Sequence, residues 1–219
     1  QLAHELILVL DDYHVIEAEQ VHAGLNYFLE HQPPNLHLLL LTRVDPPISL
    51  ARLRAHGRLV DIRARDLQFS CAEAAKLFND VSGLNLKPEQ VETLNRRAEG
   101  WIVGLNLAVM SLKRQPAPET GIERFTGSQK FILDYLTEEV VEALPDAQRQ
   151  FLLRTSILDR FCSALCSAVT DNAASQQMLE EFRNGGLFLI PLDANGTWFR
   201  YHHLFAEVLY SLLELDHPG

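Results

Sequence analysis

The chain has 219 residues, a length that suits one large domain or two to three small ones. Hydrophobic residues make up 47% of it and charged residues 22%, as in a globular protein with real cores, and no run approaches the ~20 continuous apolar residues of a membrane span. The formal net charge of −10 argues against a chain that grips nucleic acid through its phosphates, so an acidic ligand would need a local basic site.

The cysteines and the first residues of the chain indicate its compartment. Cys71, Cys162 and Cys166 form neither a disulfide framework nor a CxxC metal pair, which favours a reducing environment. The first residues contain no basic stretch that leads into an apolar one, as a secretory signal would. We therefore expect a cytoplasmic protein that does not enter a membrane.

The first third of the chain alternates strand and helix patterns. The continuous apolar run at 6–10 predicts a strand that is buried on both faces, and the run at 36–43 predicts a second buried strand. Between them, residues 17–31 have the apolar spacing of a helix, which two prolines end. A short helix is expected at 49–56, and the alternation at 59–67 predicts a third strand near the sheet edge. Strands joined by helical crossovers predict a parallel α/β sheet.

From residue 70 the pattern becomes helical. Ser70 and Glu73 have the spacing of a capping box that begins a helix. Pro88 suits the first turn of the next helix, and the sequence at 101–114 predicts a mostly buried one. The stretch at 115–127 (QPAPETGIERFTG) is rich in proline, glycine and charge, which makes it the best linker candidate, and a fourth helix follows it.

The last part of the chain combines helices with a hairpin. Asn195-Gly196 between two apolar runs is a strong hairpin signal, and a final helix with one apolar face follows the hairpin. Three helices and a β-hairpin form the winged-helix pattern. The three helices are expected at 145–156, 161–170 and 174–184, and the two strands of the hairpin at 187–192 and 197–201.

Paired carboxylates follow the first predicted strand directly. Asp11 and Asp12 would lie at the carboxyl end of the strand, where open α/β sheets bind ligands, and carboxylate oxygens are the ligands that Mg²⁺ requires. Nucleotide hydrolases of the P-loop type present a magnesium-associated acid and a water-orienting acid in this way. Two acids after a strand are also common in a solvated turn or a helix cap. A third interpretation is an enzyme that uses both as general acid and base on a small substrate.

The second predicted strand also ends in polar side chains, Thr42 and Arg43. Parallel neighbours would place Arg43 on the same rim as Asp11 and Asp12, an arrangement that suits a polyphosphate and its metal. Arginine fits such a site because its guanidinium stays charged and donates in a fork. The alternative is a surface arginine that pairs with Asp45.

The phosphate-cradling motif G-x-x-x-x-G-K-[ST] occurs nowhere in the sequence. The nearest stretch, GIERFTGSQK, has the wrong spacing and no Gly-Lys pair. Nothing in the chain would then hold the β- and γ-phosphates, because that task falls to the glycine loop and its lysine. We therefore expect this chain alone neither to bind nor to hydrolyse nucleotide.

The remaining polar and aromatic groups have simpler interpretations. The arginines between positions 52 and 65 are expected on a solvated face, paired with Asp61 and Asp66. Stacking of nucleic-acid bases needs a basic surround that the chain lacks, so three aromatic residues are expected to pack in a core or hairpin. These are Trp101, Trp198 and Tyr201.

Two adjacent histidines, His202 and His203, precede the last apolar stretch. Neighbouring residues on a helix point about 100° apart, so both cannot face one ligand. A zinc site would need further ligands at matching spacing, which the cysteines do not supply. A histidine at a helix start is most simply a cap or a surface residue.

Taken together in this order, the segments resemble the MalT-like regulators, the large ATP-binding members of the LuxR-type transcription activators. These regulators belong to the signal-transduction ATPases with numerous domains. The matching segments cover nearly the whole chain. They are LILVLDDYHVI, LHLLLLTRVDPP, LARLRAHGRLVDIRARDLQFS, AEGWIVGLNLA, FILDYLTEEV, FLLRTSILDRF and RYHHLFAEVL.

The resemblance implies roles for particular residues. In that family the strand that ends in two acids is the Walker B strand, which implies that Asp11 binds magnesium and that Asp12 is catalytic in the intact parent. The arginine of the LTR segment, here Arg43, is the sensor. A glycine motif beside the nucleotide corresponds to Gly104, without the proline that many relatives have. The winged helix contributes a histidine that reaches the β-phosphate of ADP and locks the resting state, and the match is His202.

The resemblance also implies a fold and an organisation. The expected class is α/β followed by mostly α, in three domains: 1–68 as the C-terminal part of a P-loop-type NTPase domain, 69–143 as a helical domain and 144–219 as a winged-helix domain. In the family the glycine loop lies upstream of Walker B, so the chain is interpreted as an interior fragment of a longer regulator.

The expected cofactors are ATP or ADP with magnesium, in the parent only, and slow ATPase activity is expected of the parent only. The expected partners of the parent are a small-molecule inducer, further copies of itself, and DNA through a helix-turn-helix outside this chain. For the chain itself, the sheet edge is a candidate site of homodimerisation. The alternative function is a free-standing interaction scaffold with a vestigial nucleotide site.

Overall fold

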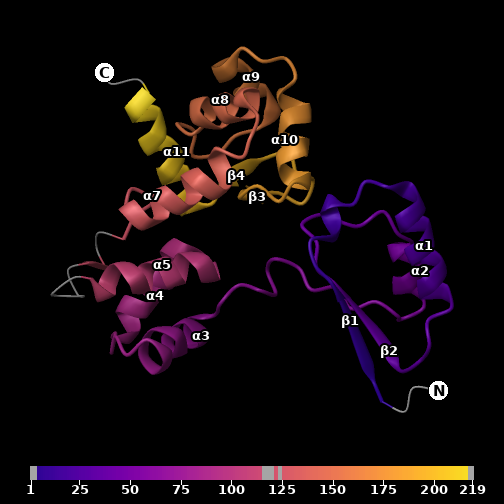
Figure 1. Cartoon of the computed structure of the whole chain (residues 1–219). Helices are drawn as coiled ribbons and strands as arrows, with labels where there is room; N and C mark the ends of the chain where they lie inside the picture. The colour runs from indigo at the N-terminus through magenta and orange to yellow at the C-terminus, as the bar shows by residue number, and fades with distance from the viewer. Residues whose placement is uncertain (1–3, 115–120, 123–124, 217–219) are drawn as a thin grey trace. The chain divides into compact units, whose positions relative to one another are not determined.

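The computed structural model describes residues 4–114, 121–122 and 125–216 (Figure 1). The chain divides into two compact units. The first comprises Gln1–Ile62 with Arg183–Leu187, and the second comprises Arg63–Phe182 with Phe188–Gly219. The first contains a pair of parallel strands and the second is mostly helical, so the predicted mixed α/β class is confirmed. That the sheet is of the P-loop type stays a prediction.

In the first unit two strands pair in parallel and in register. Strand β1 is Leu6–Leu10, as predicted, and β2 is Leu36–Leu40, shorter than the predicted 36–43. The crossover between them is one 3₁₀ turn, η1 (Tyr13–Val15), followed by α1 (Glu19–Glu30). Helix α2 (Leu50–Ala55) follows β2. Figure 1 shows α1 and α2 on the same side of the strand pair.

The strands are more exposed than predicted. Ile7, Val9 and Leu39 share one face of the pair, because side chains alternate along a strand and Val9 lies opposite Leu39. Their exposed fractions are 65%, 51% and 45%. The prediction that β1 is buried on both faces is therefore wrong. Only two strands form this sheet in the described residues, and the helices on the other face leave Leu6 and Leu8 of β1 45% and 41% exposed.

No third strand forms at 59–67, where one was predicted. Val60 is 84% exposed and Ile62 is 59% exposed, so the alternation that suggested a strand has no layer to pack against. The backbone instead makes a turn. The Asp66 carboxylate accepts the Arg63 N–H at 2.8 Å, and the Asp66 N–H donates to the Arg63 carbonyl at 2.8 Å.

The second unit begins with the predicted helices. The capping box is confirmed, since the Ser70 hydroxyl accepts the Glu73 N–H at 3.3 Å and the Glu73 carboxylate accepts the Ser70 N–H at 2.9 Å. Pro88 begins α4, also as predicted. The elements are α3 (Cys71–Ala75), η2 (Lys76–Val81), α4 (Pro88–Ala98), α5 (Ile102–Lys113), α7 (Lys130–Leu136) and η3 (Thr137–Val141). Most of the predicted linker at 115–127 lies outside the described residues, and Phe125 within it is buried.

The C-terminal part of this unit has the three helices and the hairpin that the sequence predicts. Strand β3 pairs with β4 in antiparallel register, with Ile190 opposite Arg200. The Asp193 carboxylate accepts the N–H of Thr197 at 2.8 Å and so fixes the turn, and Phe161 adds a single bridge to Phe199. The elements are α8 (Asp146–Thr155), α9 (Ser163–Thr170), α10 (Ser175–Asn184), β3 (Leu189–Pro191), β4 (Phe199–Tyr201) and α11 (His203–Asp216).

Helix α11 carries much of the core of the second unit. Leu204, Phe205, Val208 and Leu209 on it are all buried. The helix contacts α8, α7 and α4, so it joins the C-terminal part of the unit to the preceding helices. Among the helices in the described parts of the chain, none is long and apolar enough to cross a membrane.

The turn between α4 and α5 is tightly packed around Gly100. Its φ is +70°, in the left-handed region that favours glycine. The Gly100 carbonyl accepts the Phe69 N–H at 2.9 Å, and the Asn95 amide donates to the Phe69 carbonyl at 3.1 Å. A Cβ at Gly100 would lie 2.9 Å from the backbone N and O of Phe69, too close for either to remain in place.

We expect Gly100→Ala to lower the unfolding free energy of the second unit by about 1–3 kcal/mol, because the added methyl combines a strained φ with a clash against backbone. Tryptophan fluorescence during thermal unfolding is a suitable measurement, since Trp101 and Trp198 both lie in this unit. Gly83→Ala in the same unit is the control, because it has a similar φ of +69° but nothing lies within 4 Å of its added Cβ, so its effect should be smaller. An unchanged midpoint in Gly100→Ala would contradict the packing described.

Candidate functional site

The predicted acids and the predicted arginine lie at the same edge of the sheet. The pairing of β1 and β2 continues past the strands, since the Leu41 N–H donates to the Leu10 carbonyl at 2.9 Å and the Tyr13 N–H donates to the Leu41 carbonyl at 3.1 Å. These two bonds bracket Asp11 and Asp12 and bring them beside the start of the segment that contains Arg43. The carboxyl ends of the two strands thus share one edge of the sheet, and a rim formed there by the side chains of Asp11, Asp12 and Arg43 stays a prediction.

Tyr13 anchors the turn that presents the acids. Its side chain is 2% exposed, and its hydroxyl bonds Nδ1 of His22 on α1 at 2.8 Å. Asp12, just before it, has a left-handed backbone with φ +49°, and the Asp12 N–H donates to the Asp11 carboxylate at 2.9 Å. Both acids are exposed. The sequence did not single out Tyr13 or His22, whose contact spans the turn and the helix after it.

The donor set at this edge suits magnesium and phosphate but is incomplete. The two carboxylates offer the oxygen ligands that Mg²⁺ prefers, and the guanidinium of Arg43 offers a positive fork for a phosphate. Within the described residues, no group of three or more histidine, cysteine or acidic side chains is placed to hold a metal ion. Asp11 and Asp12 would therefore supply only part of a coordination shell.

His202, which the resemblance assigns to the nucleotide, is buried. It is 7% exposed, so the interpretation as a surface residue is wrong. Nε2 lies 3.0 Å from the carbonyl oxygen of Ala98, at the end of α4. The ring packs edge-on against Trp101 at 5.8 Å and Phe188 at 5.9 Å between centroids. His203, by contrast, has a side chain that is 64% exposed, so the two histidines do point in different directions.

The bond to Ala98 fixes the tautomer of His202. A carbonyl oxygen only accepts, so Nε2 must carry the proton, and the neutral ring then has no further N–H to donate. Nδ1 is buried and makes no hydrogen bond to any described residue. Burial lowers the pKa of His202, although the Glu99 carboxylate and the hydrogen bond to Ala98 oppose the shift. A neutral His202 would have to exchange its Ala98 contact before it donated to a phosphate.

Glu99 accepts three hydrogen bonds from two groups. Its carboxylate accepts two parallel hydrogen bonds from the Arg200 guanidinium, at 2.7 and 2.9 Å, and a third from the His203 N–H at 3.0 Å. Burial by itself would raise the pKa of Glu99, but the bonds from Arg200 and His203 outweigh it and lower the pKa. Its stabilising contribution is thus complete above the usual carboxyl pKa of about 4.3 and is lost as the pH falls through the lowered value.

Gly104 has a packing role in this unit. It is fully buried, and a Cβ there would lie 2.9 Å from the Trp101 ring and 3.2 Å from the Leu204 side chain. The missing side chain thus lets α5 approach the ring that covers His202 and the first turn of α11. Contact of Gly104 with a nucleotide stays a prediction.

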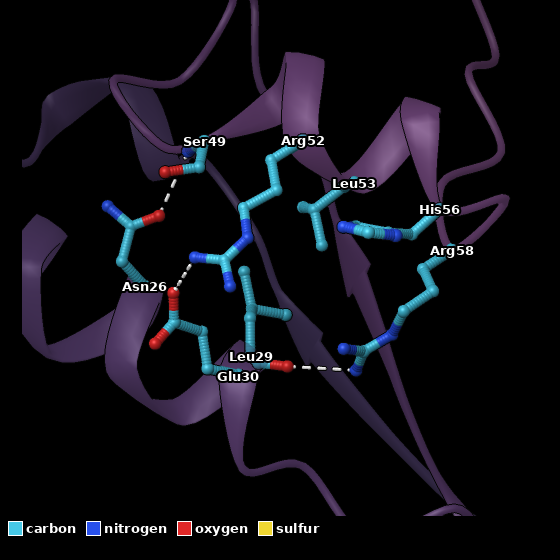
Figure 2. A pocket seen from close by; sticks show the side chains of 8 residues that line it. All are labelled: Asn26, Leu29, Glu30, Ser49, Arg52, Leu53, His56 and Arg58. Carbon is cyan, nitrogen blue, oxygen red and sulfur yellow. Dashed lines mark hydrogen bonds and ion pairs between the residues drawn. The ribbon is translucent and has the colours of Figure 1, made fainter.

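A pocket of about 320 Å³ lies between α1 and α2, away from the acids (Figure 2). A neighbouring pocket of about 230 Å³ shares Leu29, Leu53 and Arg58 with it and reaches Leu36 and His37, the first residues of β2. Both hollows therefore lie toward the amino end of β2. The acids and Arg43 are at its opposite end, so neither hollow encloses them.

The polar groups of the larger pocket are paired with one another. Figure 2 shows the guanidinium of Arg52 directed at Glu30, with which it forms an ion pair, and Arg58 donating to the Leu29 carbonyl at 2.8 Å. The predicted solvated arginine face is confirmed at Arg54, which pairs with Asp61 at 2.7 Å. Arg52 and Arg54 are thus paired with acids, whereas Arg58 donates to a backbone carbonyl and keeps its charge.

The prediction that Trp101 and Tyr201 pack in a core is confirmed, and both lie in the second unit. Tyr201 is buried, and its hydroxyl bonds that of Thr155 at 2.7 Å. Trp101 packs against Phe188 and His202. Trp198 lies in the hairpin, as expected, but is 39% exposed and sits under the guanidinium of Arg160.

The lowered pKa of His202 predicts a pH-dependent stability. An unfolded chain takes up a proton at this residue below about pH 6.5, whereas the folded chain resists it, so the unfolding free energy falls as the pH decreases through this range. His202→Gln keeps an N–H for the Ala98 carbonyl and removes the titration. We expect a shallower pH dependence between pH 7 and 5 in denaturant unfolding.

The neighbouring substitution His203→Gln is the comparison variant, since it removes a histidine whose side chain is mostly exposed and whose Nε2 lies 3.7 Å from the Glu99 carboxylate. It should change the slope less than His202→Gln does. If His202→Gln had the same slope as His203→Gln, the buried neutral state of His202 would be refuted.

Comparison with known proteins gives a consistent match. Residues 137–219 match the model of the MalT winged helix domain, which confirms the predicted winged helix. The HTH-type transcriptional regulator MalT of Yersinia enterocolitica is 36% identical over 226 residues, covering 98% of this chain and 25% of the relative. The regulators of the same name from Serratia proteamaculans and Vibrio campbellii are 35% and 33% identical, over 98% and 94% of the chain and 24% and 23% of their own lengths.

The chain thus spans about a quarter of the length of the curated relatives that it matches. The extent of these matches and the winged helix agree with the resemblance inferred from the sequence. The chain is therefore similar over nearly its whole length to part of the MalT regulators, and its residues 137–219 match the MalT winged helix domain.

Proposed function

We propose that this chain is the nucleotide-switch region of a cytoplasmic MalT-like, LuxR-type transcriptional regulator, in which ATP or ADP controls self-association and transcription. The observation that carries the proposal is the common edge at which Asp11, Asp12 and Arg43 follow two parallel strands. The relatives are named as HTH-type transcriptional regulators, which supports a role in transcription regulation.

Each residue at the edge has a chemical task in this proposal. Asp11 would hold magnesium through a carboxylate oxygen, and Asp12 beside it would orient water or accept a proton. Arg43 would contact phosphate and so report which nucleotide is bound. The chain lacks a glycine loop and its lysine, so the full-length protein would have to supply them, and any slow hydrolysis belongs to that protein.

The second unit would sense the nucleotide through His202 and the surface near Gly104. ADP would hold the resting arrangement, and exchange for ATP would release it, because a ligand shifts a conformational equilibrium only through different contacts in the two states. DNA would be bound by a helix-turn-helix outside these residues, and a small-molecule inducer would act on the same equilibrium.

A second candidate function is an interaction scaffold. The observation that favours it is the bare face of Ile7, Val9 and Leu39, on a two-stranded sheet with open edges. Unpaired edges and exposed apolar faces are common protein contact sites, and homodimerisation of the chain is the simplest form. In that case the acids would be a vestige. An acid/base enzyme has less support, since neither pocket encloses the acids.

In the full-length protein, Arg43→Ala should weaken ADP and ATP affinity at least about tenfold, as expected for the loss of a hydrogen bond to a charged group. Asp12→Asn should leave ADP affinity largely intact and abolish any ATP hydrolysis. Calorimetric titration and phosphate release measure the two effects.

Arg52→Ala is the control for this experiment, because Arg52 lines the pocket at the far end of β2. Its affinities should match those of the unmodified protein. Weaker binding in Arg52→Ala with unchanged binding in Arg43→Ala would move the nucleotide to that pocket and contradict the site proposed.

His202→Ala in the full-length protein should raise the ADP dissociation rate and the basal transcriptional activity, since a contact of the resting state is lost. The 219-residue chain alone should give no calorimetric signal with ATP or ADP at micromolar concentrations. Low-micromolar affinity of the chain alone, or an ADP dissociation rate unchanged by His202→Ala, would count against the proposal.

A further inference from the structure

The end of helix α4 is joined to the winged helix by a small set of polar contacts. The Ala98 carbonyl accepts from His202, and the Glu99 carboxylate accepts from Arg200 and from the His203 N–H. The partners lie more than 100 positions apart in the sequence, as the separations of 101 and 104 residues show. We call these contacts the Glu99 latch.

The latch is partly withdrawn from water, which makes its strength depend on all of its members. The Glu99 side chain is 12% exposed and the Arg200 side chain is 27% exposed. Two parallel bonds between a guanidinium and a carboxylate are geometrically specific as well as strong. Removal of one partner leaves a partly buried charge unmatched, which costs more than an exposed ion pair would.

The same carboxylate also begins helix α11. The His203 N–H is one of the backbone donors that have no partner within the helix, and Glu99 accepts it at 3.0 Å. A negative charge at this position also favours the aligned dipoles of a 14-residue helix. Glu99 is therefore an N-terminal cap that comes from another part of the chain.

The backbone at Glu99 indicates that the side chain is required for this contact. Its φ is +49°, in the left-handed region, and Gly100 follows at +70°. Glycine or asparagine would adopt this conformation at lower cost, so a glutamate here is unfavourable for the backbone. Such strain persists where the surrounding contacts fix it and often marks functional positions.

We propose that Glu99 is a positioning residue which holds the winged helix on α4 in the resting state, and that release of Arg200 and of the α11 N-terminus by Glu99 is the opening step of the switch. This inference rests on the proposed function for its regulatory part. Because Ala98 and Glu99 are adjacent, the latch also sets the position of the His202 ring. In the ADP-bound resting state the His202 ring would exchange its Ala98 contact for the phosphate, so the contacts of Glu99 would hold the latch closed.

Hydrogen exchange of the full-length protein with ADP tests the latch directly. Glu99→Gln keeps the size of the side chain and removes its charge. The amides at the start of α11 should exchange at least about tenfold faster, given the strength of hydrogen bonds to charged groups. Arg200→Lys, which keeps the charge and loses the fork, should have an intermediate effect and serves if Glu99→Gln does not fold.

In the double variant Glu99→Arg with Arg200→Glu, the amides at the start of α11 should exchange more slowly than in either single variant, because the ion pair is restored. Asp146→Asn is the matched control, since it removes an exposed ion pair with Arg149 on α8 of the same unit. Its α11 amides should exchange as in the unmodified protein. If the α11 amides exchanged at the same rate in Glu99→Gln as in Asp146→Asn, the latch proposal would be overturned.

The regulatory part is tested by self-association and by the ADP dissociation rate of the same variants. Glu99→Gln should self-associate at lower ATP concentration and release ADP faster than the Asp146→Asn control. Faster exchange at α11 with unchanged self-association would overturn the regulatory role and leave a purely structural contact. A full-length protein that binds no nucleotide, yet shows faster exchange in Glu99→Gln, would refute the proposed function while supporting the latch.

Discussion

A charge that leaves water must be matched by its neighbours, and in the second unit Glu99 is the place where this constraint is met. Its carboxylate is satisfied by Arg200 and the His203 N–H together, and neither would suffice for a side chain that is only 12% exposed. This requirement joins β4, α4 and α11 at one point, beside the apolar core that α11 carries. His202 meets the same requirement only at Nε2, which donates to a backbone carbonyl. Its Nδ1 is buried and makes no hydrogen bond to any described residue.

Local patterns predicted the local structure well. Ser70 with Glu73, Pro88 and the Asn195-Gly196 turn each carry their effect within a few residues, and each formed as expected. The parallel pairing of the first two strands followed from apolar runs separated by a helix. The failures concern what lies around an element. Residues 59–67 alternate like a strand but have no neighbouring strand or apolar layer, and alternation alone does not supply one.

The candidate site was predicted in part for the same reason. The sequence predicted the positions of Asp11, Asp12 and Arg43 at the strand ends, because strand ends can be predicted from sequence and parallel neighbours share an edge. Glu99 and Arg200 were missed because no pattern links residues 101 positions apart. The one available signal was a charged residue directly before Gly100, where a helix ends and a left-handed backbone is expected. Tyr13 and His22 were missed because their hydrogen bond depends on how α1 folds back over the turn.

The bare face of the strand pair has a consequence for how molecules of this chain meet one another in solution. The strand pair exposes an apolar surface formed by Ile7, Val9 and Leu39, and its sheet has only two strands in the described residues. Copies of the chain that meet through this surface can therefore associate. The net charge of −10 opposes such collisions at neutral pH through mutual repulsion. Acid and concentrated salt both weaken this repulsion, so colloidal stability should depend on the buffer even where every fold contact remains intact.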